Sequence, residues 1–188
     1  MTYEPKKYES LLGVKGISEV MLKNHLTLYE GYVKNVNAFV ELSKTLKIGS
    51  VEYNEIRRRF GWEWNGMKLH ELYFEALAKD FKELDVQGDL YLNLITAFGS
   101  YENWLVDFKI LGLTRGIGWA ALVRDKQSGV LMNIWLGEHD MGHLANEEIL
   151  LIMDVWEHAY MTDYGIKRAE YIENFLKIID WSVVEKRF

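Results

Sequence analysis

The chain contains a single proline, Pro5, so no segment after it is broken by a residue that cannot donate a backbone hydrogen bond. Long helices are therefore allowed, and the first is predicted from Ser18 to about Leu46, with Ser18 as its N-cap. Apolar residues recur there at helical spacing, at Val20, Met21, Leu28, Tyr32, Val36, Phe39, Val40 and Leu46. We predict one long helix, or one interrupted helix, and further helices over 51–59 and from about 65 to 84.

The second half of the chain has a different pattern. After a turn at Gln87-Gly88-Asp89, helices are predicted over 90–98 and 101–110. Residues 119–124 and 130–136 predict two strands joined by a turn at 126–129, and 149–155 predicts a third strand that can be buried on both faces. An amphipathic helix is predicted over 168–179, after the strands. Single helices and strands therefore do not alternate along the chain. The predicted fold class is therefore α+β and not a doubly wound sheet.

Composition excludes several classes of protein. With 49% hydrophobic residues, the chain can bury a core in one domain or in two small ones. A net charge of -6 without a basic stripe predicts no nucleic-acid partner, and the absence of cysteine excludes disulfides and thiolate metal sites. No phosphate-binding glycine motif, signal peptide or bilayer-length apolar run occurs, so we expect a cytoplasmic protein without a nucleotide cofactor or a membrane partner.

The segment richest in chemistry is DVWEHAY, residues 154–160. Asp154 ends an apolar stretch, and a buried carboxylate needs a partner or a metal ion. His158, four positions later, can turn toward the same point. Two interpretations stay open from the spacing alone: a buried Asp–His hydrogen bond that only stabilises the fold, or part of a metal site.

The chain has five histidines, and two of them, His25 and His70, fall on separate predicted helices of the N-terminal half. Together with His158 and Asp154 they would supply three imidazoles and one carboxylate. This donor set suits iron or manganese, and zinc could also bind. A histidine on a helix is nevertheless more often a surface or hydrogen-bonded core residue than a ligand.

Several motifs resemble the iron/manganese superoxide dismutase family in order and approximate spacing. DVWEHAY is the signature of that family, and NGMKLHELYFEAL (65–77) is similar to its second ligand helix. Further similar segments are GYVKNVNAF (31–39), AFGSYENW (97–104), GIGWAAL (116–122) and RAEYIENFLKIIDW (168–181). The resemblance covers almost the whole chain.

The resemblance implies an N-terminal helical hairpin domain, residues 1–86, and a C-terminal α/β domain with a three-stranded antiparallel sheet, residues 87–188. One iron or manganese ion per subunit would lie between them, held by His25, His70, Asp154 and His158. It further implies that Trp119 and Trp156 wall the pocket, and that Glu157 reaches across a twofold interface to the ligand histidine of a second subunit. A homodimer or homotetramer is therefore expected.

Two departures from the family pattern concern residues around the ion. The family's first ligand aligns with Asn24, yet His25, Tyr29 and Tyr32 share one face of a regular helix, so we predict His25 as the ligand after loss of one residue from the helix. His139 aligns with the outer-shell residue that contacts metal-bound solvent. The gateway histidine is replaced by Leu28 or Tyr29, and the interface tyrosine by Met161. His143 has no counterpart and is predicted to be loop surface.

The function implied by the resemblance is the disproportionation of superoxide to dioxygen and hydrogen peroxide. His139 and Tyr32 are the candidates for the hydrogen-bond network near the ion, and Lys34 and Arg168 for a basic funnel. Two alternatives remain: a non-catalytic metal-binding relative in which Asn24 replaces the ligand, and a different metalloenzyme on the same scaffold.

Overall fold

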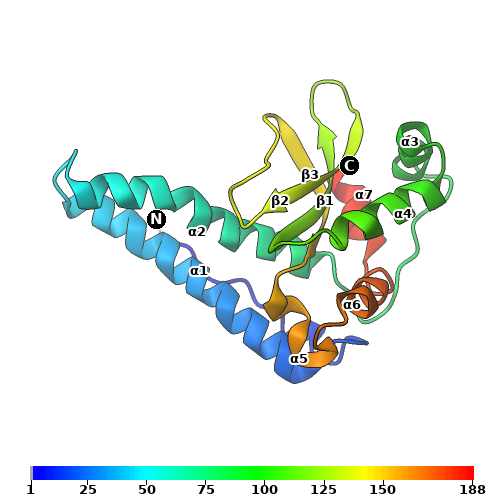
Figure 1. Cartoon of the computed structure of the whole chain (residues 1–188), viewed down its shortest axis with the longest axis horizontal. Helices are drawn as coiled ribbons and strands as arrows, with labels where there is room; N and C mark the ends of the chain where they lie inside the picture. Colours follow the sequence, from blue (N-terminus) through cyan, green and yellow to red (C-terminus); the bar gives the residue numbers. More distant parts are fainter. Residues whose placement is uncertain (1) are drawn as a thin grey trace.

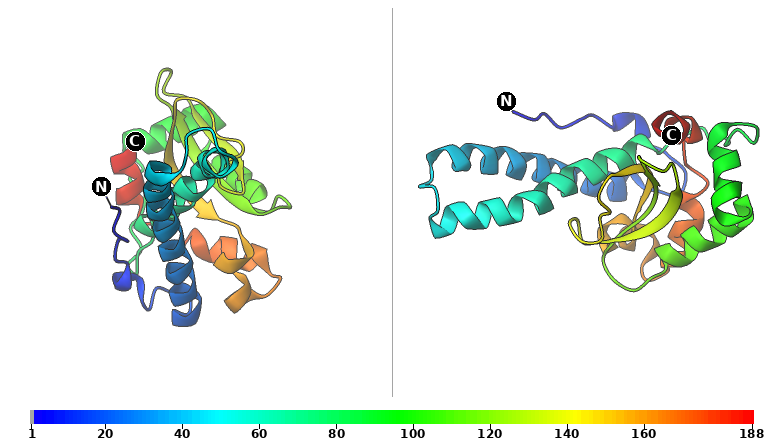
Figure 2. Two further views of the ribbon diagram at one scale, coloured as in Figure 1. Left: turned by 90° about the vertical axis from the view of Figure 1, so that its left-hand side faces the viewer. Right: turned by 90° about the horizontal axis from the view of Figure 1, so that it is seen from above.

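A computed structural model of the chain describes residues 2–188. Two long helices, α1 (Glu19–Thr45) and α2 (Val51–Glu75), form a hairpin whose far end projects away from the rest of the molecule (Figure 1). The sheet and the shorter helices gather around the other end of the hairpin, as the two further views also show (Figure 2). The predicted α+β fold class is confirmed, and the division at residue 86 stays a prediction.

Helix α1 follows the sequence prediction closely. The Ser18 side chain accepts a hydrogen bond from the Met21 backbone N–H at 3.1 Å, as an N-cap serine does. The helix is 27 residues long and is not interrupted. Its buried residues recur every three or four positions and form one stripe, which comprises Met21, Leu22, His25, Tyr29, Tyr32, Val33 and Val36.

Helix α2 corrects the prediction of two separate helices over 51–59 and 65–84. The helix runs without a break through Gly61 and ends at Glu75. Beyond this point the backbone pairs with a distant segment instead of continuing the helix. Ala78 donates to the Ile178 carbonyl at 2.8 Å, and Asp180 donates to the Ala76 carbonyl at 2.8 Å. These tertiary hydrogen bonds replace the next helical turn.

The three predicted strands form one antiparallel sheet. Strands β1 (Gly118–Asp125), β2 (Leu131–Gly137) and β3 (Glu147–Asp154) lie in the order β2-β1-β3. Trp119 on the central strand pairs with Leu136 on one side and with Asp154 on the other. This register places the last residue of β3 beside Trp119 at one end of the sheet.

Helices cover both faces of the sheet. Side chains alternate along a strand, so Trp119 and its neighbour Ala120 face opposite sides. The Trp119 ring meets His70 of α2, whereas Met153, which pairs with Ala120, lies against Gly112 at the end of α4 (Tyr101–Gly112). Helix α3 (Asp89–Phe98) precedes α4, as predicted.

The C-terminal segment contains more short helices than the single one predicted over 168–179. After the 3-10 turn η2 (Glu157–Ala159) come α5 (Met161–Tyr164), α6 (Arg168–Phe175) and α7 (Trp181–Arg187). Helix α7 has its own N-cap, because the Asp180 carboxylate accepts from the Ser182 backbone N–H at 3.1 Å. The predicted helix therefore ends at Phe175, and a new one begins after Asp180.

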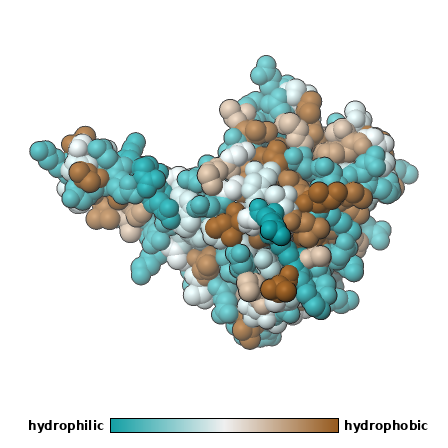
Figure 3. All heavy atoms as spheres, viewed as in Figure 1, coloured by the Kyte–Doolittle hydropathy of each residue, from teal (hydrophilic) through white to brown (hydrophobic). Residues whose placement is uncertain are grey.

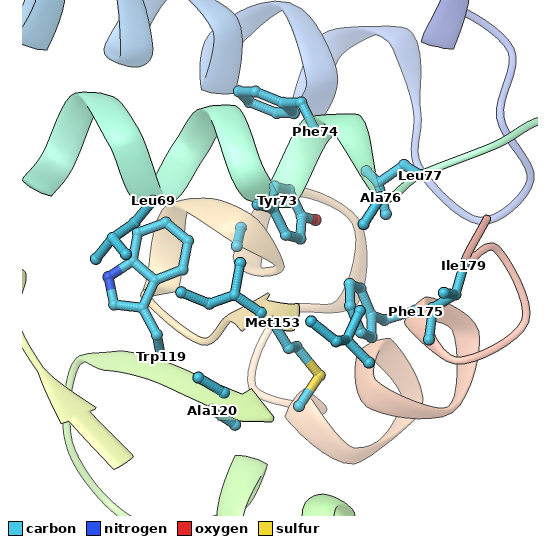
Figure 4. Close-up of a cluster of buried hydrophobic side chains, with 14 of the residues drawn as sticks. Leu69, Tyr73, Phe74, Ala76, Leu77, Trp119, Ala120, Met153, Phe175 and Ile179 are labelled. Carbon is cyan, nitrogen blue, oxygen red and sulfur yellow. The ribbon is translucent and has the colours of Figure 1, made fainter. Parts of the chain in front are cut away.

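The core lies where α2, the sheet and α6 meet. Figure 4 shows Leu69 and Tyr73 of α2 facing Trp119, Ala120 and Met153 of the sheet, with Phe175 and Ile179 beside them. Phe74 points to the other side of α2, where its ring packs against His25 of α1. On the outer surface, hydrophobic residues form small patches among hydrophilic ones over the sheet-bearing part (Figure 3). None of the helices within residues 2–188 has the length and apolar character needed to cross a membrane.

Candidate metal centre

Four side chains from separate parts of the fold converge at the base of the hairpin. His25 comes from α1, His70 from α2, Asp154 from the end of β3, and His158 from η2. Their ligand atoms all lie within 4.8 Å of one another. The Asp154 Oδ2 atom is 3.0 Å from His25 Nε2, 3.1 Å from His158 Nε2 and 3.5 Å from His70 Nε2. The structure thus brings together all four predicted ligands.

Asp154 is fully buried, and both its Oδ1 atom and its main-chain carbonyl have a fixed partner. Its Oδ1 atom accepts from the Trp156 backbone N–H at 2.9 Å, and its main-chain carbonyl accepts from the Tyr171 hydroxyl at 2.7 Å. Tyr171 in turn lies 3.1 Å from the Tyr73 hydroxyl, which therefore donates to it. Oδ2 is left as the one carboxylate oxygen that faces the three imidazoles.

His70 is the most informative ligand candidate, because one of its nitrogens has no partner. Its Nδ1 donates to the Gly66 carbonyl at 2.5 Å, so Nε2 carries the lone pair of a neutral ring. Nε2 is buried without a hydrogen-bond partner among the described residues. A buried acceptor left without a donor is costly, and a cation at the centre would satisfy it. The donor set of three nitrogens and one oxygen fits a mononuclear iron or manganese ion.

For three of the four ligand candidates, the electrostatics agree with the metal-binding protonation state. Burial lowers the pKa of His25, and burial together with the neighbouring His25 holds the pKa of His70 well below its ordinary value. Burial opposes ionisation of Asp154, but His158 and His25 keep the pKa of this carboxyl well below its usual range. For His158, Asp154 outweighs burial and raises the pKa. Neutral His25 and His70 and ionised Asp154 are the forms that bind metal.

The helical-face argument for the first ligand position agrees with the geometry. Asn24 is exposed, whereas His25 is buried and contacts Asp154. The His25 ring also packs edge-on against His70, with ring centroids 5.0 Å apart. Of the two adjacent residues, His25 is the one that lies beside Asp154.

Next to the four ligand candidates lies a buried hydrogen-bond chain of Trp119, His139 and Tyr32. The Trp119 indole N–H donates to His139 Nδ1 at 3.1 Å, and His139 Nε2 is 2.8 Å from the Tyr32 hydroxyl. Because indole can only donate, His139 Nδ1 accepts and Nε2 carries the proton. His139 therefore donates to the Tyr32 oxygen, and the Tyr32 O–H remains free to donate elsewhere.

Burial sets the protonation state of this chain. It lowers the pKa of His139 to about 4, so the ring is neutral at physiological pH. Burial, together with the charge of Asp154, raises the pKa of Tyr32 above its ordinary value. Tyr32 is thus a proton donor in hydrogen bonds and not a base.

Two tryptophans form further walls, and sequence reasoning identified only one of them. Trp156, a predicted wall residue, stacks on His139 with ring centroids 4.8 Å apart. Trp62, which was missed, contacts His139 at 4.6 Å between centroids and Tyr32 at 5.5 Å. Trp62 stands eight residues before His70 on the same face of α2. The predicted break between two helices hid this spacing.

Some residues predicted to lie near the ion have other contacts. The Tyr29 hydroxyl accepts from the Lys6 backbone N–H at 3.0 Å and lies 3.3 Å from Glu71, so it is directed away from the Tyr32–His139 pair. Glu157 is exposed in the single chain, and Met161 is 46% exposed. The Arg168 guanidinium lies 5.9 Å from the rings of Trp135 and Tyr160.

His143 lies in the loop between β2 and β3, as predicted, but its side chain is not freely exposed. Its side chain is only 27% exposed, and both ring nitrogens have partners. Nδ1 is 2.6 Å from the Glu147 carboxylate, and Nε2 is 3.0 Å from the His139 carbonyl. A loop histidine four residues before a glutamate was the available signal, but its contact with His139 depends on the fold.

Comparisons with known proteins agree with these features. Residues 86–187 match the family described as iron/manganese superoxide dismutases, C-terminal domain. The chain is 34% identical over 180 residues to superoxide dismutase (Fe) of Cupriavidus metallidurans, covering 92% of this chain and 89% of the relative. It is 33% identical to superoxide dismutase (Fe) of Saccharolobus solfataricus, with 92% and 84% covered. Superoxide dismutase (Mn) 2 of Haloferax volcanii is 32% identical over 195 residues, with 100% and 96% covered. The chain therefore belongs to the iron/manganese superoxide dismutase family, a family of oxidoreductases.

Proposed function

We propose that this protein disproportionates superoxide to dioxygen and hydrogen peroxide at a mononuclear iron or manganese site. The observation that carries the proposal is the convergence of three imidazoles and one carboxylate within 4.8 Å, together with the unpartnered, buried Nε2 of His70. His25, His70, Asp154 and His158 would hold the ion. When bound, the ion supplies one-electron chemistry, alternating between its trivalent and divalent states.

The residues around the ligands would control protons and water. Tyr32 and His139 are proposed to orient solvent beside the ion, since the Tyr32 O–H is free to donate and His139 holds the Tyr32 oxygen at 2.8 Å. Trp119 keeps His139 in the tautomer that this arrangement requires. Trp156 and Trp62 exclude bulk water from the same space, since both pack against the His139 ring. We propose that such contacts around the ligands decide between iron and manganese. The names of the relatives include both metals.

We further propose that the active unit is a cytoplasmic homodimer or larger homo-oligomer. Two observations support a partner at η2: Glu157 is exposed, and the His158 side chain is 22% exposed although its Nε2 faces Asp154. A carboxylate from a second copy would hold the outer nitrogen of His158, as outer partners of metal-bound histidines do. Glu157 is the candidate for that carboxylate.

The test is to load the purified protein with ferrous or manganous salt, measure bound metal by elemental analysis and follow superoxide decay by stopped-flow absorbance. We expect about one ion per chain and decay much faster than the spontaneous reaction. Protein that binds the ion but does not accelerate decay would contradict the activity and favour a non-catalytic relative. Protein that binds no ion would contradict the site itself.

A further inference from the structure

His143 connects three elements around the loop that carries His139. On its inner side, Nε2 lies 3.0 Å from the His139 carbonyl and 3.3 Å from the Asn65 side-chain nitrogen of α2. On its outer side, Nδ1 lies 2.6 Å from Glu147 at the start of β3. Asn65 donates to the same His139 carbonyl at 2.8 Å. The His139 main chain is therefore held from two directions.

The loop that carries His139 is short and contains a residue in a rare backbone conformation. Gly137 and Met141 close it through two backbone hydrogen bonds, of 3.0 and 3.2 Å. Glu138, immediately before His139, has a φ of 49°, in the left-handed region that non-glycine residues rarely adopt. A backbone conformation of this kind persists only where surrounding contacts hold it. One such contact is the bond of 3.0 Å from the Trp62 indole N–H to the Glu138 carboxylate.

We propose that His143 is a positioning residue for His139, acting through the main chain as a protonated bridge between Glu147 and the His139 carbonyl. This inference rests on the proposed function, because His139 is assigned there to the solvent-orienting pair with Tyr32. A shift of the His139 carbonyl moves the imidazole relative to the Tyr32 hydroxyl, 2.8 Å away. His143 touches none of the four ligand candidates in the described contacts.

The bridge depends on the charge of His143. Both of its partners, Glu147 and the His139 carbonyl, are acceptors, so holding both requires an N–H on each ring nitrogen. A neutral ring has only one N–H. In the neutral form Nδ1–H can stay on Glu147, while Nε2 accepts from Asn65, and the His139 carbonyl then loses one of its two donors. The same ring thus has two hydrogen-bond arrangements separated by one proton.

Protons can reach this ring from outside without passing the metal centre. His143 lines an open cleft of about 690 Å³ between α2, β3 and α7. The charged groups that face it there are Lys68, Lys126, Glu147, Glu148, Lys186 and Arg187. Arg187 is bonded to the Leu150 and Leu72 carbonyls and to Glu75. Glu148 is paired with Arg124 at 2.6 Å, which leaves Glu147 as the carboxylate in contact with the ring.

The experiment compares His143→Ala, His143→Gln and Glu147→Gln with the wild-type holoenzyme. Leu144→Ala, an exposed change in the same loop, is the matched control. We expect His143→Ala to keep bound metal and thermal stability but to lower kcat/KM about tenfold, a usual effect of removing an outer-shell partner. Wild type should show a limb in its pH profile where the His143 ring loses its second N–H. Both His143→Gln and Glu147→Gln should lack that limb, and Leu144→Ala should retain it.

A second readout does not depend on activity. Crystal structures of wild type and His143→Ala at low and at high pH should show the His139 ring displaced from Tyr32 in the variant at both, and in wild type only where the His143 ring is neutral. Unchanged kcat/KM, pH profile and His139 position in His143→Ala would overturn the proposal. If His143→Ala does not fold, Glu147→Gln decides by the same criteria. If wild type does not disproportionate superoxide, the proposed function fails, and the two sets of crystal structures still decide whether His143 positions His139.

Discussion

Which nitrogen of each imidazole carries the proton decides what the centre can do. His70 donates from Nδ1 to the Gly66 carbonyl and directs a lone pair inward, whereas His139 accepts at Nδ1 from Trp119 and donates from Nε2. The two rings therefore have opposite tautomers, and each tautomer is imposed by a neighbour of fixed polarity. The tautomer thus distinguishes His70, a candidate ligand, from His139, which is proposed to orient solvent, although both are buried histidines.

The buried, neutral His139 predicts acid sensitivity. Its pKa falls from an ordinary 6.5 to about 4 through burial, so the unfolded chain binds this proton at higher pH than the folded one. Above pH 6.5 His139 is neutral in both states and does not lower the free energy of unfolding. As pH falls from 6.5 toward about 4, protonation of His139 in the unfolded chain lowers the free energy of unfolding by about 3 kcal/mol. Urea titrations of wild type and His139→Gln between these pH values measure it. His139→Gln should lose less stability on acidification, and equal losses would refute the assignment.

The register of α1 predicts which of two adjacent residues binds the ion. His25→Ala should reduce metal affinity by more than the ten- to hundredfold typical of outer-shell changes, because a ligand is removed. Asn24→Ala, at an exposed position, should leave bound metal unchanged. Elemental analysis after dialysis against a weak chelator compares the two. Metal loss in Asn24→Ala alone would reverse the assignment.

Residue types with special chemistry were predictable from the sequence, but their neighbours were not. His25, His70, Asp154 and His158 could be singled out by motif and by helical face. Trp62 and Asn65 could not, because their contacts with the His139 loop exist only once α2 packs beside it. Short-range spacing carries no information about such long-range contacts.

At the scale of elements, α2 carries His70 and also packs its backbone against the Tyr32 ring of α1, and Gly66 makes this close packing possible. Gly66 is buried, and a Cβ atom there would lie 2.6 Å from Cδ1 of Tyr32. The missing side chain lets the Tyr32 ring of α1 approach the α2 backbone beside His70. A Cβ atom on Gly61, five residues earlier in the same helix, would meet nothing within 4 Å. The two glycines therefore differ in what an added methyl group would do.

Alanine at these two positions should have opposite effects. Gly61→Ala should stabilise the protein by about 0.5–1 kcal/mol, because alanine favours helix more than glycine does. Gly66→Ala gains the same propensity but displaces Tyr32, so we expect a net loss of about 1–3 kcal/mol and reduced activity. Denaturant unfolding and superoxide decay test both variants. Stabilisation of both would mean that Tyr32 moves without cost.

The helix prediction succeeded for α1 and failed in part for α2 and for the segment after α6. In α1, cap, periodicity and burial all agree. In α2 the helix passes through Gly61 without a break and ends where Ala76 and Ala78 bond to the chain near residue 179. The pairing across about a hundred residues could not be predicted from the sequence, and the separate helix α7 was missed with it.

At the scale of the whole molecule, a bound ion would join α1 and α2 to β3 and η2. Because folded protein binds the ion and unfolded chain lacks the site, free metal at 100 times Kd should add about 2.7 kcal/mol. For a chain of this size that raises Tm by about 5–10 °C. Calorimetry with manganous salt and with chelator measures the difference. His158→Ala is the control in which the shift should shrink, and an equal shift in that variant would place the ion elsewhere.

The contact between His25 and Asp154 spans 129 positions of the chain, and this separation has a consequence for biosynthesis. While the protein is being translated, the emerging hairpin offers only two imidazoles to the cellular metal pool. The carboxylate and the third imidazole follow later in the chain, on β3 and η2. The complete set of four side chains that could discriminate among competing cations thus exists only after the sheet and η2 have packed against the hairpin, and not in the nascent hairpin itself.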